Sequence, residues 1–245
     1  MKNSSRSTTK NSSDQLSTIE VIFFDAGNTL LKARPSVGSI YQKTASKYGV
    51  TPSVSELEES FRRQWKESKL SGDFLAESAG KGQEVEKIWW KKFVRGVFKE
   101  FDPIENFDAF FDELYDTFAQ PSSWELFPEV IEVLSELLSR GFRLGLISNW
   151  DSRLPGILSG LEIDHFFSEI VVSSLVELEK PDRRIFLLSA GRMNVPVEKA
   201  AHVGDDPLLD YKGAQEAGLL PFLVDRTGDG HRDMRTIRSL QQLIR

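Results

Sequence analysis

Polar side chains follow four short apolar runs that lie far apart in the chain. The runs are residues 21–24, 144–147, 170–172 and 201–203. The polar residues that come after them are Asp25, Ser148, Asn149, Lys180, Asp205, Asp206 and Asp210. If the fold brings these side chains into one crevice, they provide a nucleophile, hydrogen-bond donors, a cation and a cluster of oxygen ligands.

Each of these residue types has a role in group-transfer chemistry. The carboxylate of Asp25 can attack phosphorus or carbon and form a covalent intermediate. Clustered aspartates offer the hard oxygen ligands that suit Mg²⁺ bound together with substrate phosphate. Lys180 can neutralise negative charge on nucleophile and substrate, and the Ser148 hydroxyl can bind phosphate oxygens. Each residue could instead cap a helix or form a turn, but the occurrence of the whole set in order favours the functional interpretation.

The apolar runs predict the strands that would position these residues. A short, fully apolar run is typical of a strand buried on both faces, and a fifth run follows at residues 221–224. Helical patterns lie between the runs at residues 129–139, 183–193 and 208–217. This alternation predicts an α/β fold with a doubly wound parallel sheet, in which ligands bind at the carboxyl ends of the strands.

The stretch from residue 32 to residue 127 does not alternate in this way, and we expect only helices in it. Ser53 and Glu56 form a capping box at the start of one helix, and residues 83–101 and 104–118 have helical spacing of aromatic residues. We therefore predict an inserted α-helical cap domain at residues 33–126. The α/β core domain would comprise residues 18–32 and 127–229, followed by a C-terminal segment at 230–245.

Composition excludes several classes of protein. The 245 residues include no cysteine, which excludes disulfides, thiolate metal sites and a cysteine nucleophile. With 31 basic and 37 acidic residues the net charge is −6, so a globally basic surface for nucleic acid is absent. No apolar run is long enough to span a membrane. We expect neither nucleic acid nor a membrane as partner, and the sequence leaves the oligomeric state open.

The first 17 residues are polar and rich in Ser, Thr and Asn. They lack the apolar region of a secretory signal, and their composition predicts a disordered tail. The same Ser-rich, basic composition also suits a short organelle transit peptide. We therefore expect a cytoplasmic protein, with an organelle as the alternative location.

The motifs at the four strand ends resemble those of the haloacid dehalogenase-like hydrolase superfamily. They are FFDAGNTL, LISN, KPDRRIF and HVGDDPLLD, and they occur in the family's order. The helical insert after the first motif is similar to the family's C1-type cap. The stretches PSVGSIY and ISNWDSRLPGIL further resemble one subgroup within the family. The resemblance extends from about residue 19 to residue 225.

This resemblance implies a small phosphorylated substrate or ligand, Mg²⁺ as cofactor and an aspartyl-phosphate intermediate on Asp25. It assigns catalytic roles to Asp25, Ser148 and Lys180. The implied phosphate-binding residues are Thr29, Ser148, Asn149 and Lys180. The implied metal site comprises Asp25, the carbonyl of Gly27, Asp205 and Asp210, with Asp206 as an additional contributor.

Gly27 departs from the family's pattern. Phosphatases of the family have an Asp at this position, which protonates the leaving group and then activates water. Such a group contributes a factor of ~10² to 10⁴ in rate. The retained acidic cluster argues against a dehalogenase, and no cap lysine stands out as the reactive lysine of a phosphonatase. Two hypotheses remain: a weakened phosphoryl hydrolase, or a catalytically silent relative that binds a phosphorylated ligand or a protein partner.

Overall fold

A computed structural model describes residues 16–71, 82–228, 230 and 233–245. The first 15 residues, most of the predicted tail, lie outside the described residues. Leu16, which we had assigned to that tail, is buried in the core. Within the described residues no helix combines the length and the apolar character needed to cross a bilayer.

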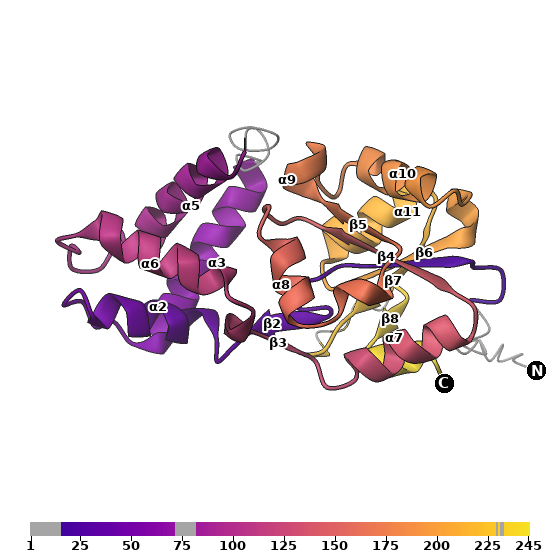
Figure 1. Cartoon of the computed structure of the whole chain (residues 1–245), viewed down its shortest axis with the longest axis horizontal. Helices are drawn as coiled ribbons and strands as arrows, with labels where there is room; N and C mark the ends of the chain where they lie inside the picture. Colours follow the sequence, from indigo (N-terminus) through magenta and orange to yellow (C-terminus); the bar gives the residue numbers. More distant parts are fainter. Residues whose placement is uncertain (1–15, 72–81, 229, 231–232) are drawn as a thin grey trace, which may run out of the picture.

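One parallel sheet forms the centre of the larger part of the molecule (Figure 1). Its strand order is β5-β4-β1-β6-β7-β8, and all five neighbouring pairs are parallel. The strands are β1 (Val21–Phe24), β4 (Arg143–Ser148), β5 (Glu169–Val172), β6 (Ala200–Gly204), β7 (Leu220–Val224) and β8 (Thr236–Ile237). The five predicted strands are all present, and β8 adds a sixth from the segment at 230–245.

Helices cover both faces of this sheet because successive side chains of a buried strand point to opposite sides. Ile22 and Phe24 pack with α7 (Val130–Ser139) and α8 (Leu154–Gly160). Val21 and Phe23 pack on the other face with α10 (Arg183–Arg192) and α11 (Gly213–Ala217). The predicted doubly wound α/β fold is confirmed.

Shorter elements complete this part of the chain. They are the helix α9 (Ser173–Val176), the 3₁₀ turns η1 (Pro121–Ser123), η2 (Asp164–Phe166), η3 (Val197–Lys199) and η5 (Leu240–Leu243), and the π-helix η4 (Pro207–Lys212). The helix predicted at 208–217 is therefore divided, since a π-helical turn precedes α11.

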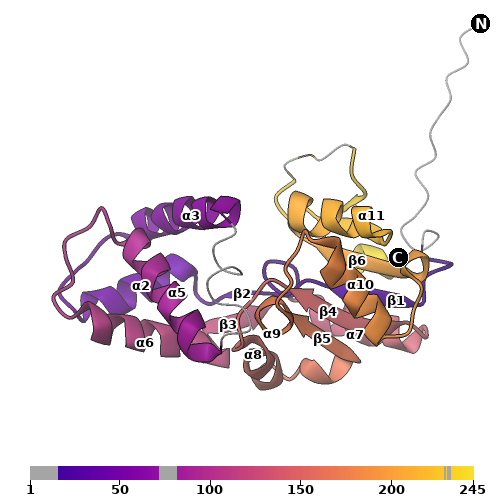
Figure 2. The same cartoon turned by 90° about the horizontal axis from the view of Figure 1, so that it is seen from above.

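The described helices between residues 37 and 119 form a second body beside the sheet, visible in both views (Figures 1 and 2). They are α2 (Val37–Ser46), α3 (Val54–Ser71), α5 (Gln83–Val97) and α6 (Phe107–Ala119). Their aromatic side chains build a separate core, in which Tyr41, Phe93 and Phe110 are buried. Glu56 accepts from the backbone N–H of Ser53, as the capping-box pattern predicted.

A short antiparallel pair joins the two bodies and corrects our expectation of helices only from residue 32 to residue 127. Strand β2 (Leu31–Ala33) pairs with β3 (Trp124–Leu126). One strand leads into the helical body and the other leads out, so they run side by side in opposite directions. Three residues are too few to give a recognisable alternating pattern in the sequence.

Candidate active site

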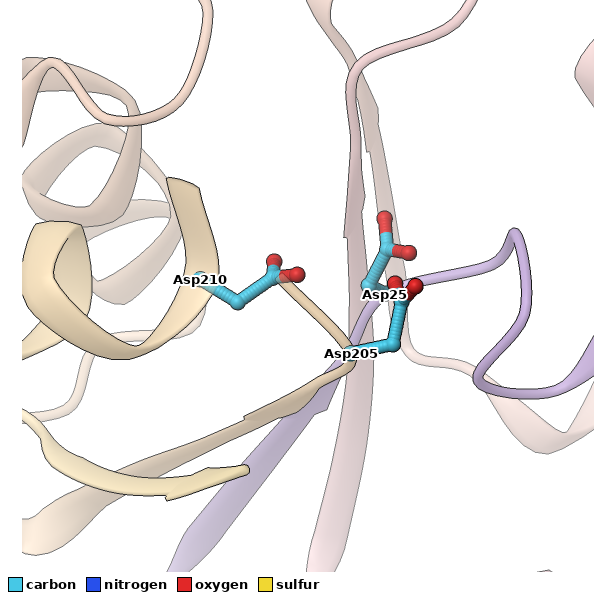
Figure 3. Close-up of side chains that lie close together, drawn as sticks. All are labelled: Asp25, Asp205 and Asp210. Carbon is cyan, nitrogen blue, oxygen red and sulfur yellow. The ribbon is translucent and has the colours of Figure 1, made fainter. Parts of the chain in front are cut away.

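The predicted polar residues meet at the carboxyl edge of the sheet. Asp25 follows β1, Ser148 ends β4, Lys180 follows α9, and Asp205 follows β6. Asp210 comes from η4 and points toward the carboxylates of the other two aspartates (Figure 3). The parallel topology explains this convergence, because the carboxyl ends of neighbouring parallel strands lie on one edge.

Asp25 lies at the centre of a buried hydrogen-bonded group. Its Oδ1 accepts from Ser148 Oγ at 3.0 Å and from Lys180 Nζ at 2.6 Å. Burial raises the pKa of the Asp25 carboxyl above its usual value, although the Lys180 charge opposes this rise. The ammonium and the hydroxyl thus fix one carboxylate oxygen of the candidate nucleophile.

Lys180 bridges two carboxylates. Besides Asp25, its Nζ donates to Asp210 Oδ1 at 2.5 Å, and the lysine is 3% exposed. Burial alone would lower the pKa of Lys180, but the charges of Asp210 and Asp25 outweigh it and raise the pKa. Lys180 is therefore a permanent cation in this site.

Asp210 is held by its neighbours on both carboxylate oxygens. Oδ1 is bonded to Lys180 and, at 2.8 Å, to His202 Nε2, while Oδ2 accepts from the backbone N–H of Asp206 at 3.0 Å. Burial lowers the pKa of His202, so its ring is neutral and Nε2–H donates. A Cβ on Gly204 would lie 2.2 Å from the Asp210 Cγ, so only glycine fits at the end of β6. These contacts make Asp210 a residue that orients Lys180.

Asp205 completes a cluster that suits a divalent cation. Carboxylate oxygens of Asp25, Asp205 and Asp210 lie within 4.8 Å of one another. Burial, followed by the charges of Asp25 and Asp210, raises the pKa of Asp205 to about 8. When all three carboxyls are ionised, three carboxylates and one ammonium leave two negative charges. A divalent ion would balance this charge, and carboxylate oxygen is the ligand type that Mg²⁺ prefers.

Asn149 and Thr29, two predicted phosphate ligands, have different surroundings. The Asn149 amide bonds the backbone of Lys180 in both directions, each at 2.8 Å. Its side chain therefore positions Lys180 directly. The Thr29 hydroxyl is buried and has no hydrogen-bond partner among the described residues.

Gly27 and Asp206 lie at the border of the cluster. Gly27 contributes only backbone to the first loop, and an indole carbon of Trp150 lies 3.3 Å from the position a Cβ would take. Asp206 caps η4, because its Oδ1 accepts from the backbone N–H groups of Leu208 and Leu209. That carboxylate oxygen is thus used in shaping the turn that carries Asp210.

The sequence analysis missed several residues that position the site. Arg226 donates to the backbone carbonyl of Thr29 at 2.8 Å and pairs with Glu129 at 2.7 Å, which supports the first loop from the end of β7. Glu86 of the helical body is 2% exposed and accepts from the N–H and hydroxyl of Ser152. The sequence could have indicated Arg226, because it is a charged residue that follows a predicted strand. No local sequence pattern distinguishes Glu86 from the other charged residues of its helix.

Asp151 forms a second connection between the two bodies. It is fully buried, pairs with Arg153 at 2.6 Å and accepts from the indole N–H of Trp90 at 2.7 Å. Arg153 in turn donates to the backbone carbonyl of Tyr115. The loop that begins with Ser148 is thus bonded to α5 and α6, so the helical body and the active-site loop are mechanically linked.

Comparison with known proteins identifies related chains. The model of the haloacid dehalogenase-like hydrolase family matches residues 19–218. Haloacid dehalogenase-like hydrolase domain-containing protein 3 of Danio rerio is 33% identical over 229 residues, which cover 91% of this chain and 92% of that protein. This is the subgroup that the stretches PSVGSIY and ISNWDSRLPGIL indicated.

Solved structures share the fold at lower identity. A dehalogenase matches with a TM-score of 0.72 and 19% identity, covering 93% of this chain and 96% of the other. A phosphatase from Thermococcus onnurineus matches with a TM-score of 0.63 and 22% identity, covering 92% and 96%. At this identity the two structures support the architecture, including the helical body beside the sheet.

Proposed function

We propose that this chain, which belongs to the haloacid dehalogenase-like hydrolase family, is a Mg²⁺-dependent phosphoryl hydrolase that works through an aspartyl-phosphate on Asp25. The observation that carries the proposal is the Asp25 carboxylate bonded to Lys180 and Ser148, with Asp205 beside it. A nucleophilic carboxylate, a fixed cation and carboxylates able to hold a divalent metal ion are groups that suit phosphoryl transfer to an aspartate.

The chain's own residues would act at defined points. Lys180 and Ser148 hold Asp25 in one orientation, so attack on phosphorus needs no rearrangement of the nucleophile. Lys180 is in turn fixed by Asn149 at its backbone and by Asp210 at its ammonium group. It would also neutralise charge that builds up on the transferring phosphoryl group.

The acidic cluster would hold Mg²⁺ through Asp25, the Gly27 carbonyl and Asp205, with Asp210 behind them. A bound Mg²⁺ supplies positive charge that attracts the substrate phosphate and stabilises the transition state. Because both oxygens of Asp210 are already bonded, we assign it a supporting role in this site.

Gly27 limits the substrates that such a site can use. With no side chain at this position, the first loop offers no acid two residues after the nucleophile. We propose substrates whose leaving group departs without a proton, such as acyl phosphates or phosphoanhydrides. The small phosphorylated substrate itself would be selected by the helical body over the crevice.

A second candidate function follows from the same glycine. A relative that has lost acid–base catalysis can retain the phosphate-binding and metal-binding groups and act as a binding protein for a phosphorylated ligand or a protein partner. Gly27 favours this function, whereas the intact Asp25–Lys180 pair favours the hydrolase.

Hydrolysis of p-nitrophenyl phosphate and acetyl phosphate, with and without Mg²⁺, tests the proposal. Both leaving groups depart without protonation, so we expect Mg²⁺-dependent turnover that Asp25→Asn abolishes. Leu208→Ala is a matched control, because Leu208 is 60% exposed and contributes no side chain to the cluster. Absence of turnover, together with tight binding of phosphate and Mg²⁺, would favour the binding protein instead.

A further inference from the structure

Trp150 lies against the one residue in which the first loop departs from the family's pattern. Its ring atom Cζ3 is 3.3 Å from the position that a Cβ on Gly27 would take. Ordinary van der Waals contact begins at 3.4 Å. Apart from Gly27 and its two chain neighbours, no other heavy atom of the described structure lies within 4 Å of that position. A Cβ at position 27 would therefore press on the indole alone, and it would fit only if the indole shifted by a few tenths of an ångström.

The indole is held in place from two directions. Its ring packs edge-on against Trp124 of β3, with centroids 4.9 Å apart. Its backbone is fixed by α9, because Trp150 N–H donates to Ser173 Oγ at 3.1 Å and Trp150 O accepts from the Ser174 N–H at 3.3 Å. The ring cannot leave the first loop without breaking contacts to β3.

The residue that follows Trp150 adds to this anchoring. Asp151 is fully buried and accepts from the Trp90 indole N–H of α5. Trp150 therefore packs against the β2–β3 pair and directly precedes a residue that is bonded to the helical body.

We infer that Trp150 is a positioning residue whose indole packs against the Cβ position of residue 27 and so favours glycine over an acidic residue beside Asp25. The glycine and the tryptophan form one packing arrangement, in which a Cβ at position 27 requires the anchored indole to shift by a few tenths of an ångström. Gly27 does not have the positive φ that would itself require glycine. The preference for glycine at this position would come from the contact with Trp150.

This arrangement has a chemical consequence that rests on the proposed function. An apolar ring cannot give a proton to a leaving group or take one from water, so that side of Asp25 has no acid–base catalyst. The site then uses substrates whose leaving group departs without a proton. The bond between an Asp25 oxygen and phosphorus forms as the bond from phosphorus to the leaving group breaks. Hydrolysis of the resulting aspartyl-phosphate, which needs an activated water, becomes the slow step.

A stability cycle tests the packing arrangement without reference to activity. The variants are Gly27→Ala, Trp150→Leu and their combination, with Tm measured for each. Leucine stays apolar but ends two bonds short of Cζ3. Pressing a methyl group against the anchored indole should lower Tm by about 2 to 4 °C when Trp150 is present. In the Trp150→Leu background the same methyl group should cost nothing measurable.

Gly156→Ala provides the matched control. Gly156 lies in α8, and no atom lies within 4 Å of the position its Cβ would take. This variant should leave Tm unchanged or raise it in both backgrounds. The inference would be overturned if Gly27→Ala changed Tm equally in both backgrounds. It would also be overturned if Gly27→Ala lowered Tm no more than Gly156→Ala does. If Trp150→Leu fails to fold, the Gly27→Ala and Gly156→Ala pair alone still decides the question.

An activity measurement separates this inference from the proposed function. On glycerol phosphate, whose alcohol leaving group needs a proton, we expect Gly27→Asp with Trp150→Leu to exceed Gly27→Asp alone by at least ~10-fold. The inference would be contradicted if Gly27→Asp alone hydrolysed glycerol phosphate as fast as the double variant does. If no variant turns over any phosphate ester while the stability cycle shows the expected coupling, the proposed function fails and the packing arrangement stands.

Discussion

Replacing Asp205 by asparagine should stabilise the metal-free protein, and the gain should grow with pH. Burial and the charges of Asp25 and Asp210 raise the pKa of Asp205 from 3.8 to about 8. The folded chain therefore keeps this proton up to about pH 8, whereas the unfolded chain releases it near pH 4. Because the native state binds more protons across this window, the free energy of unfolding falls as pH rises through it.

The size of the effect follows from the pKa shift. Each pH unit inside the window costs about 1.4 kcal/mol of stability. Between pH 5 and pH 8 the free energy of unfolding of the wild-type protein should thus fall by about 4 kcal/mol more than that of Asp205→Asn. The variant has no proton to release at this position. Above pH 8 the two curves should become parallel, since the carboxyl is then ionised in both states.

Urea unfolding followed by circular dichroism at pH 5, 6, 7 and 8 in the presence of a chelator measures this difference. Asp102→Asn is the control, because it makes the same change at an exposed position. Added Mg²⁺ at 100 times its dissociation constant should stabilise the wild-type protein by about 2.7 kcal/mol. Asp205→Asn should lose most of this gain. Parallel curves for wild type and Asp205→Asn from pH 5 to 8 would refute the reasoning.

Three further variants test how the site is held. Lys180→Met leaves two buried carboxylates without their cation, so the free energy of unfolding should fall by about 3 to 5 kcal/mol and turnover should vanish; urea unfolding and the p-nitrophenyl phosphate assay measure these effects. Glu86→Ala removes the acceptor of two Ser152 donors, and a loss of about 1 to 3 kcal/mol is expected, with Glu84→Ala as the exposed control on the same helix. Arg226→Met frees the carbonyls of the first loop, so kcat should fall while the far-UV spectrum stays unchanged.

The fold was largely predictable because each buried strand is a local apolar run. The runs at residues 21–24 and 201–203 predict strands without knowledge of their partners. Where one parallel strand ends, its neighbours end as well, so the order of the motifs was enough to expect Asp25 and Asp205 on one edge. The three-residue β2–β3 pair escaped prediction because backbone pairing between distant segments forms it.

Side-chain partners, in contrast, were decided by packing between segments that are far apart in the chain. Ser148 and Lys180 reach Asp25 across 123 and 155 residues, and no local pattern encodes which carboxylate oxygen they share. Asp210, predicted as a metal ligand, also bonds Lys180 and the backbone N–H of Asp206, and no local pattern encodes these partners.

Position 27 illustrates the same division between sequence and structure. The residue type alone shows that the first loop has glycine at this position and therefore no acid there. The neighbour of that position depends on the folded chain, since Trp150 reaches the loop from a strand end more than a hundred residues away. The physical reason is that residue type limits the chemistry available at a position, whereas close packing of distant segments determines which neighbour excludes which side chain.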